Sequence, residues 1–199
     1  MVKKADIPKH IVATALELAA DRPWAMITAR DIAAAAGVPL ATVQAHYPTK
    51  NAILEAFTRR ITAEVLADEN GFDAEELPRD RLFDVLMRRF DALGPYRPGM
   101  AAILKNAPGE GLSTVALAPA VREAMGWMLE AAGVPTGGLA GELRIGAVMV
   151  VWLATLRVWI RDDSPDLART MAALDRHLRR ADRMVGGFPG TDGPISEAA

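Results

Sequence analysis

The sequence has no cysteine among its 199 residues and only three histidines. Without cysteine there can be no disulfides and no thiolate metal ligands, which fits a reducing cytoplasm. The histidines, at positions 10, 46 and 177, do not have the spacing of a metal site. The sequence also lacks a phosphate-binding Gly-rich loop, a Gly-x-Ser-x-Gly turn and a His-Glu-x-x-His helix. We therefore expect no enzyme, no metal site and no cofactor.

Signals for β-strands and for membrane insertion are also missing. No alternating run of residues is bounded by hairpin turns. The most apolar stretch, 145–160, contains Arg157 and is shorter than the roughly 20 residues that span a bilayer. The apolar pattern of the first residues is interrupted by Glu17 and Asp21, without a cleavage signal. We expect a cytoplasmic protein with no membrane span and no signal peptide.

Helical periodicity extends over nearly the whole chain, and hydrophobic residues make up 51% of it. Such a chain can bury a sizeable core between helices. The sequence therefore predicts an all-α fold, with helices at 7–21, 29–36, 39–47, 50–66, 79–93, 98–107, 115–132, 138–161 and 164–185.

Local signals set several of the predicted helix ends. Thr28 with Asp31 has the spacing of a capping box, and Thr49 can cap the fourth helix. Gly37 can end the second helix in a left-handed conformation. The run Ser164–Asp166 has a capping residue, a proline and an acid, which together predict a helix start.

Charge is distributed unevenly along the chain, whose net charge is −2. The first 60 residues have eight Lys or Arg and five Asp or Glu, against 15 and 20 in the rest of the chain. A basic first part suggests a polyanionic partner for that part, although ordinary scatter of surface charge gives a similar difference.

A short predicted helix between Gly37 and Pro48 follows another helix across a glycine-containing turn. This order is typical of a helix-turn-helix, in which the second helix enters the major groove of DNA. Val43, with Val38 and Tyr47, can form its inner face. The outer face then presents Gln44, which can pair with adenine, beside Leu40 and two alanines whose methyl groups can contact thymine.

Residues 10–56 resemble the DNA-binding domain of the TetR family of bacterial repressors. The resemblance rests on "IVATALELAA", "TARDIAAAAGV", Thr42, "HYPTK" and "AILEAF". It implies a three-helix DNA-binding head at 1–50 with a linking helix at 50–66, a larger helical ligand-binding and dimerisation domain at 67–187, and a flexible tail at 188–199. By position it implies that Arg30, Leu40, Ala41 and Gln44 read bases, and that Thr28, Thr42, His46, Tyr47 and Lys50 contact phosphates.

The head differs from the family pattern at three positions of the short helix. Gln44 stands where the family often has an aromatic residue, Ala41 where it often has Gly or Pro, and Pro39 where it often has Ser. The short helix also has no Lys or Arg. Three interpretations stay open: a different operator sequence, weakened DNA binding, or a three-helix unit kept only for folding.

Residues 82–184 also resemble the lipid-binding proteins of coenzyme Q biosynthesis, which share the TetR fold. The matching stretches lie at Arg88–Leu104, Met125–Gly133 and Trp152–Met184. The alternative function is therefore a lipid- or isoprenoid-binding accessory protein of ubiquinone biosynthesis with a vestigial helix-turn-helix. The head matches its pattern, and the short tail cannot form a membrane-docking helix, so we favour the regulator.

The C-terminal half concentrates methionine and aromatic side chains, which suit either a ligand pocket or an ordinary core. The predicted pocket residues are Met87, Phe90, Met100, Met125, Trp127, Met128 and Trp152. The predicted dimer interface lies on the last two helices, at Val148, Val151, Leu156 and Leu174. The function expected from all of this is a ligand-responsive repressor that binds a palindromic operator in double-stranded DNA as a homodimer, with a small apolar molecule as its ligand.

Overall fold

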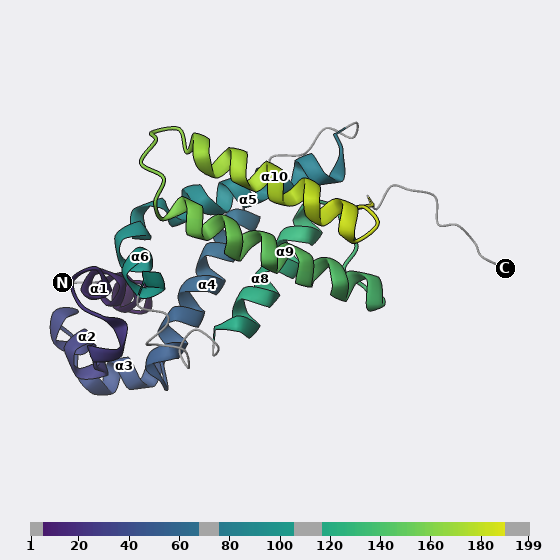
Figure 1. Cartoon of the computed structure of the whole chain (residues 1–199). Helices are drawn as coiled ribbons and strands as arrows, with labels where there is room; N and C mark the ends of the chain where they lie inside the picture. The colour runs from purple at the N-terminus through teal and green to yellow at the C-terminus, as the bar shows by residue number, and fades with distance from the viewer. Residues whose placement is uncertain (1–5, 68–75, 106–116, 190–199) are drawn as a thin grey trace. The chain divides into compact units, whose positions relative to one another are not determined.

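The computed structural model describes residues 6–67, 76–105 and 117–189, and all regular elements in these ranges are helical (Figure 1). The predicted all-α fold is confirmed. The chain forms two compact units, one from Met1–Ile61 with Leu93–Ala120 and the other from Thr62–Ala92 with Val121–Ala199. This division differs from the predicted boundary at residue 67, because residues 93–105 belong with the head. The acidic segment 68–75 and residues 190–199 of the predicted tail lie outside the described residues.

The first unit packs short helices around the buried side chains of Ile11, Ala15, Trp24, Ile32 and Ile53. Its elements are α1 (Ile7–Asp21), the 3-10 turn η2 (Trp24–Met26), α2 (Ala29–Ala35), α3 (Leu40–His46), the first part of α4 (Lys50–Leu66), the 3-10 turn η3 (Gly94–Tyr96) and α6 (Arg97–Lys105). The predicted end of α1 and both predicted ends of α4 are confirmed.

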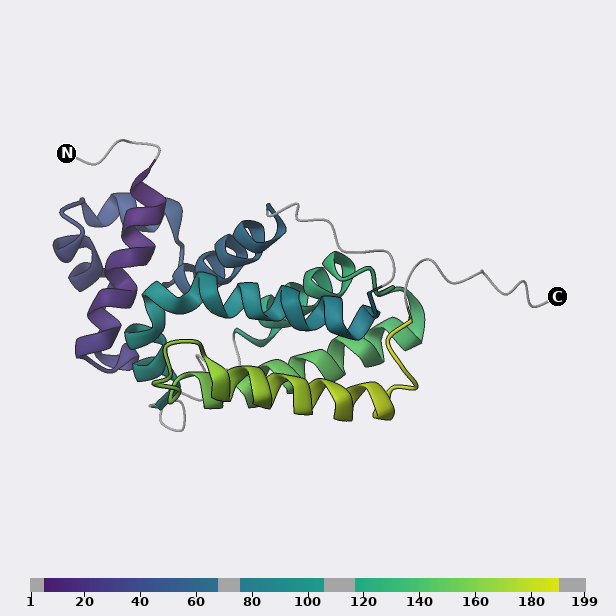
Figure 2. The same cartoon turned by 90° about the horizontal axis from the view of Figure 1, so that it is seen from above.

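Helix α6 packs directly on α1, which explains its place in the first unit (Figure 2). The contact is at Gly99, where an added Cβ would lie 2.2 Å from the carbonyl oxygen of Leu16. Only glycine allows the two backbones to come this close. The sequence offered no local sign of this contact, because Gly99 reads as an ordinary residue near the start of a helix.

The second unit surrounds an aromatic and methionine core. Its helices are the end of α4 together with α5 (Pro78–Leu93), α8 (Ala118–Ala131), α9 (Gly138–Trp159) and α10 (Ala168–Met184). The ring of Phe90 stacks on that of Trp152, with 4.5 Å between centroids, and lies 5.7 Å from that of Trp159. Phe188, the first residue of the predicted tail, is buried too.

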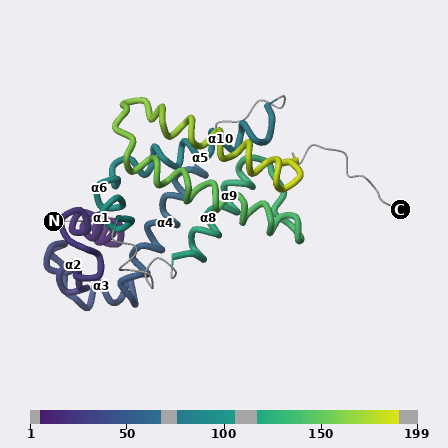
Figure 3. Tube along the Cα trace, in the orientation of Figure 1, coloured from purple at the N-terminus to yellow at the C-terminus, as the bar shows by residue number. Residues whose placement is uncertain are grey.

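Helices α9 and α10 form a hairpin in which the chain turns back after Trp159 (Figure 3). The prediction that α10 starts at Ser164 is wrong, since the helix begins at Ala168. The buried carboxylate of Asp162 takes over the capping role, and accepts hydrogen bonds from the backbone N–H and hydroxyl of Thr170, at 2.8 and 2.7 Å. Burial opposes ionisation of Asp162, but the hydrogen bonds from Ser164 and Thr170 outweigh it and hold the pKa well below its usual range.

Candidate nucleic-acid interface

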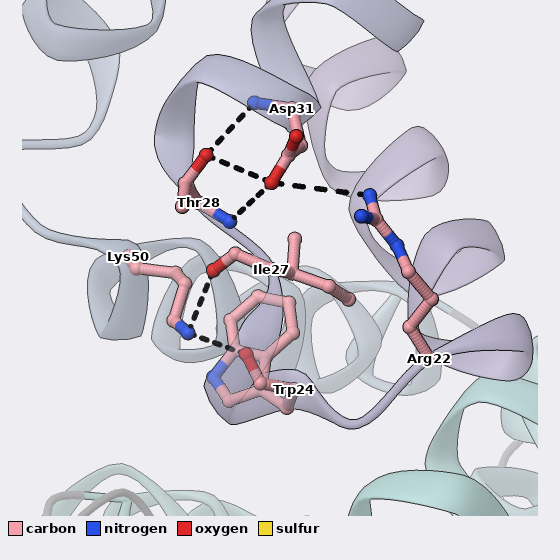
Figure 4. A network of polar contacts seen from close by, with 6 residues as sticks. All are labelled: Arg22, Trp24, Ile27, Thr28, Asp31 and Lys50. Carbon is pink, nitrogen blue, oxygen red and sulfur yellow. Dashed lines mark hydrogen bonds and ion pairs between the residues drawn. The ribbon is translucent and has the colours of Figure 1, made fainter.

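Helix α2 begins with the predicted capping box, which is confirmed. The backbone N–H of Asp31 donates to Thr28 Oγ1 at 3.1 Å, and the backbone N–H of Thr28 donates to Asp31 Oδ2 at 2.8 Å (Figure 4). These hydrogen bonds, led by the one from the Thr28 backbone, lower the pKa of Asp31. Arg22 lies 3.9 Å from the same carboxylate. The Thr28–Asp31 capping box fixes the start of α2, the first helix of the helix-turn-helix.

A tight turn at Gly37 ends α2. Gly37 has φ +63°, as predicted, and Val38 and Gly37 donate backbone hydrogen bonds to Ala33 and Ala34 at 3.0 and 3.2 Å. This is the Schellman arrangement, and it satisfies carbonyls that the helix end leaves open. Helix α3 then starts at Leu40, directly after Pro39. The turn therefore sets the direction in which the short helix leaves α2.

The inner face of α3 is anchored by Val43 and Tyr47. Val43 is buried, and the hydroxyl of the partly buried Tyr47 donates to the carbonyl oxygen of Pro8 at 3.0 Å. Burial raises the pKa of the Tyr47 phenol, against the opposing effect of Arg60 and Arg59. The hydroxyl of Tyr47 thus holds α3 against the start of α1 inside the protein, and the phosphate contact predicted for Tyr47 stays a prediction.

The outer surface of the helix-turn-helix carries the residues predicted to read bases. Helices α2 and α3 pack on each other, and all four side chains are exposed: Arg30 on α2, and Leu40, Ala41 and Gln44 on α3. Gln44 is the amide among them, with both a donor and an acceptor to offer. Base reading by these four residues stays a prediction, and their exposure is what it requires.

The residues predicted to contact phosphates fall into two groups. His46 is exposed and Thr42 is partly buried, so both stay candidates for backbone contacts. Thr28 is exposed, but its hydroxyl donates to Asp31 Oδ2 at 2.8 Å while accepting the N–H of Asp31. Its side chain therefore caps α2, and the adjacent carboxylate would repel a phosphate.

Lys50, the remaining phosphate candidate, holds two parts of the head together. Its ammonium donates to the backbone carbonyls of Trp24 and Ile27, the latter at 2.9 Å, and lies 4.8 Å from the centre of the Trp24 ring (Figure 4). The first residue of α4 is thereby tied to the segment that leads into α2. The phosphate contact predicted for Lys50 stays a prediction, and the structure gives Lys50 an internal role as well.

Two anchoring residues of the head were missed from the sequence. Trp24 is fully buried in the connection between α1 and α2. His10 brings its Nε2 within 3.2 Å of the carbonyl oxygen of Ala36, at the end of α2. A tryptophan in a short inter-helix segment was the one available signal, because large aromatic side chains are rarely left in solvent.

The residues predicted to line a ligand pocket do not all come together. Phe90, Met125, Met128 and Trp152 are buried in the second unit, and Met87 is partly buried there. Trp127 is 50% exposed, and Met100 belongs to the first unit. Trp127 and Met100 therefore do not lie with the other predicted pocket residues. Helical periodicity alone could not show which side of α8 faces inward or which unit includes α6.

The predicted interface residues also need correction. Val148, Val151, Leu156 and Leu174 are all buried against their own chain. The exposed apolar side chains of α9 are instead Leu139, Leu143 and Val150. The sequence could not separate the two sets because apolar residues occur on all sides of this helix.

The described residues include no group of three or more His, Asp or Glu placed to hold a metal ion. Helix α9 is long and apolar enough, by length and composition alone, to cross a membrane. Core helices pass the same test, and α9 packs on α10 with seven of its residues buried. We therefore read α9 as a helix of the second unit that buries one side against its own chain and leaves apolar side chains exposed on the other.

Comparison with protein families finds a match to the bacterial regulatory proteins of the tetR family over residues 11–57. These residues include α2, α3 and most of the anchoring contacts described above. Comparison with curated proteins finds no match.

Several solved structures have a similar fold along most of the chain. A TetR transcriptional regulator from Nitrosomonas europaea ATCC 19718 is 25% identical, with 87% of this chain and 97% of that chain covered and a TM-score of 0.67. One from Rhodococcus sp. RHA1 is 18% identical, with 90% and 97% covered and a TM-score of 0.65. A tetR-family regulator from Streptomyces coelicolor is 23% identical, with 97% and 94% covered and a TM-score of 0.55. The resemblance to coenzyme Q biosynthesis proteins gains no support from these comparisons.

Proposed function

We propose that this chain represses transcription by binding a palindromic operator as a homodimer. By its N-terminal domain and by the solved structures that it resembles, it is a TetR-family transcriptional regulator. Its chemistry is binding, since proteins of this family are not enzymes. A regulator of this kind acts where the chromosome is, so we place it in the cytoplasm.

The observation that carries the proposal is the outward face of α3. The Schellman turn at Gly37 and the buried contacts of Val43 and Tyr47 hold this helix rigidly, while Gln44 and its exposed neighbours face solvent. A short, fixed helix with an exposed amide is what reading of the major groove requires.

Two heads are needed to occupy successive major grooves about 34–36 Å apart. A homodimer with two-fold symmetry meets this need, and its operator would then be palindromic. Dimerisation falls to the second unit, whose helix α9 exposes Leu139, Leu143 and Val150. A ligand in the second unit would regulate by binding more tightly to a dimer whose head spacing does not fit the operator.

Selection of bound sequences from random duplex DNA with the purified full chain tests the proposal. We expect a consensus of two inverted half-sites. The matched control is a variant with Gln44→Ala and Arg30→Ala, which removes two predicted base readers from the surface of the head. Recovery of no consensus by the unmodified protein would contradict sequence-specific regulation.

A further inference from the structure

The second unit contains a buried cation with no acidic partner among the described residues. Arg89, on α5, is 3% exposed. No carboxylate of the described chain forms an ion pair with it, and burial is the sole cause that shifts the pKa of its guanidinium, to about 10. The group therefore stays protonated at neutral pH, and its positive charge lies inside an apolar unit.

The contacts of Arg89 satisfy only part of its hydrogen-bonding capacity. Its Nη1 donates to Thr62 Oγ1 at 2.9 Å, whereas its Nε is buried and has no hydrogen-bond partner. The guanidinium carbon lies 5.3 Å from the centre of the Trp152 ring. A guanidinium has five N–H donors, and the one on Nε of Arg89 lies buried without an acceptor.

Buried charges in proteins are normally paired, because an uncompensated charge in an apolar interior is strongly unfavourable. A neutral side chain of similar size would fill the same space without that cost. An arginine at this position, beside an aromatic stack, therefore calls for an acidic partner from outside the described residues, and a bound ligand can be that partner.

We propose that Arg89 is the anion-recognising residue of the ligand site in the second unit, and that the ligand is an apolar monocarboxylate. The inference rests on the proposed function, since it names the ligand class of the site through which this regulator would respond. A carboxylate matches a guanidinium in geometry and can pair with it through two parallel hydrogen bonds. The rings of Phe90 and Trp152 stack close to the guanidinium, so the apolar part of a molecule bound there would lie in aromatic surroundings.

The single charge of the ligand follows from charge balance. One guanidinium balances one carboxylate, whereas a phosphate monoester would bring a second negative charge into the same apolar surroundings. Arg81, two turns earlier on α5, is also buried and its Nε likewise lacks a hydrogen-bond partner, but its guanidinium lies beside Gly133, where an added Cβ would be 3.4 Å from Nη1. Arg144 donates to the carbonyl oxygen of Pro135 and is only partly buried. Neither contacts the aromatic stack in the described structure.

Matched acids and amides test the inference. Decanoate and 2-naphthoate are compared with decanamide and 2-naphthamide, which have the same apolar bodies without the charge, by calorimetry and thermal shift on the full chain. We expect at least one acid to bind at least tenfold more tightly than its amide. Equal affinity of acids and amides, or no binding of either acid at millimolar concentration, would overturn the proposal.

Variants at position 89 test whether the preference for acids over amides depends on Arg89. Arg89→Gln should weaken acid binding by roughly ten- to a hundredfold and leave amide binding nearly unchanged. Arg89→Lys keeps the positive charge but loses the parallel N–H donors of the guanidinium, so it should retain a weaker preference for the acid. If the Gln variant does not fold, the Lys variant is used in its place. Arg161→Gln, at an exposed position of the same unit, should bind like the unmodified protein. Unchanged acid affinity in folded Gln and Lys variants would remove Arg89 from the site.

Binding to DNA is measured separately, so that the two proposals fail independently. If the chain binds the acids but selects no operator, the inference about Arg89 stands and the regulator is contradicted. If it selects an operator but does not distinguish acids from amides, the regulator stands and the ligand class is wrong.

Discussion

Among the exposed side chains of α3, Gln44 is best able to distinguish one base pair from another, because its amide can pair with adenine through two hydrogen bonds. We expect Gln44→Ala to relax the preference at one base pair in each half-site, by roughly 1–3 kcal/mol. Non-specific affinity should change little, since it comes mainly from phosphates. Competitive binding to operators changed one position at a time, at fixed salt, measures this. If the variant keeps the full preference everywhere, Gln44 does not read bases.

Lys50 gives a second prediction on the scale of single residues. Its ammonium is hydrogen-bonded to the carbonyls of Trp24 and Ile27, so Lys50→Ala should lower the free energy of unfolding of the head by roughly 1–3 kcal/mol. Chemical unfolding of the isolated full-length protein, without DNA, measures this loss. Unchanged stability would show that these hydrogen bonds contribute nothing in solution.

The salt dependence of DNA binding then decides whether Lys50 also contacts a phosphate. Loss of one phosphate contact makes the dependence on salt shallower by about one unit of slope. Lys9→Ala, at an exposed position of α1, is a control for removal of a positive charge. A folded Lys50 variant with the slope of the unmodified protein would limit Lys50 to its internal role.

The roles of these residues were predictable from the sequence only where their partners are close along the chain. Thr28 and Asp31 are three residues apart, and their pairing was predicted correctly. The acceptors of Lys50 and Tyr47 are backbone carbonyls 23 to 39 residues away. Carbonyls have no sequence signature, so such contacts become visible only when the packing of the helices is known.

On the scale of whole elements, helix boundaries were likewise predictable only where the capping group lies close along the chain to the groups it caps. The ends of α2 and the start of α4 were set correctly by Thr28, Gly37 and Thr49, each within three residues of the groups it caps. The start of α10 was placed wrongly at Ser164 because its cap, Asp162, lies eight residues before Thr170. A loop intervenes, with Leu167 in a left-handed conformation at φ 54°, and no spacing rule covers such an arrangement.

The carboxylate of Asp162 should therefore stabilise the α9–α10 hairpin. Asp162→Asn replaces a charged acceptor of several buried hydrogen bonds, and we expect it to lower the free energy of unfolding by about 1–3 kcal/mol at pH 7. Urea unfolding followed by tryptophan fluorescence measures the loss, because three of the four tryptophans, at positions 127, 152 and 159, lie in this unit. Asp163→Asn, at the exposed neighbouring position, is the matched control and should have no effect.

The effect of Asp162 should depend on pH in one direction. Because the pKa of the folded state is held below the usual value, the carboxylate contributes fully above about pH 4 and loses its contribution as the pH falls further. The stability difference between the unmodified protein and the Asn variant should thus be constant from about pH 5 to 8 and shrink in acid. A difference that grows on acidification would contradict this account of the cap.

At the scale of the whole molecule, the second unit presents two unlike surfaces to a partner. The exposed apolar residues of α9 follow one another at intervals of four and seven, which places them along one stripe. The outer face of α10 is basic, with exposed arginines at positions 169, 176, 179, 180 and 183. Two copies of such a face would repel each other, so a symmetric interface is better served by α9.

We therefore expect the homodimer to form through the stripe of Leu139, Leu143 and Val150. Val150→Glu would place a carboxylate without a partner at the centre of a desolvated contact, at a cost of about 3 kcal/mol or more. The dissociation constant of the dimer should then rise by roughly two orders of magnitude or more, and sedimentation at micromolar concentration should show monomers. Ala172→Glu, which adds the same charge to an exposed position of α10, should leave the dimer intact.

Each outcome of this comparison has a distinct meaning. If the unmodified protein sediments as a monomer at micromolar concentration, the dimer itself is wrong. If Ala172→Glu dissociates the dimer and Val150→Glu does not, the interface lies on α10, despite the repulsion expected between its arginines. If Val150→Glu alone dissociates it, high affinity for a palindromic operator should be lost together with the dimer, because a single head occupies only one half-site. Its weak non-specific binding should persist, since each head keeps its own surface for DNA.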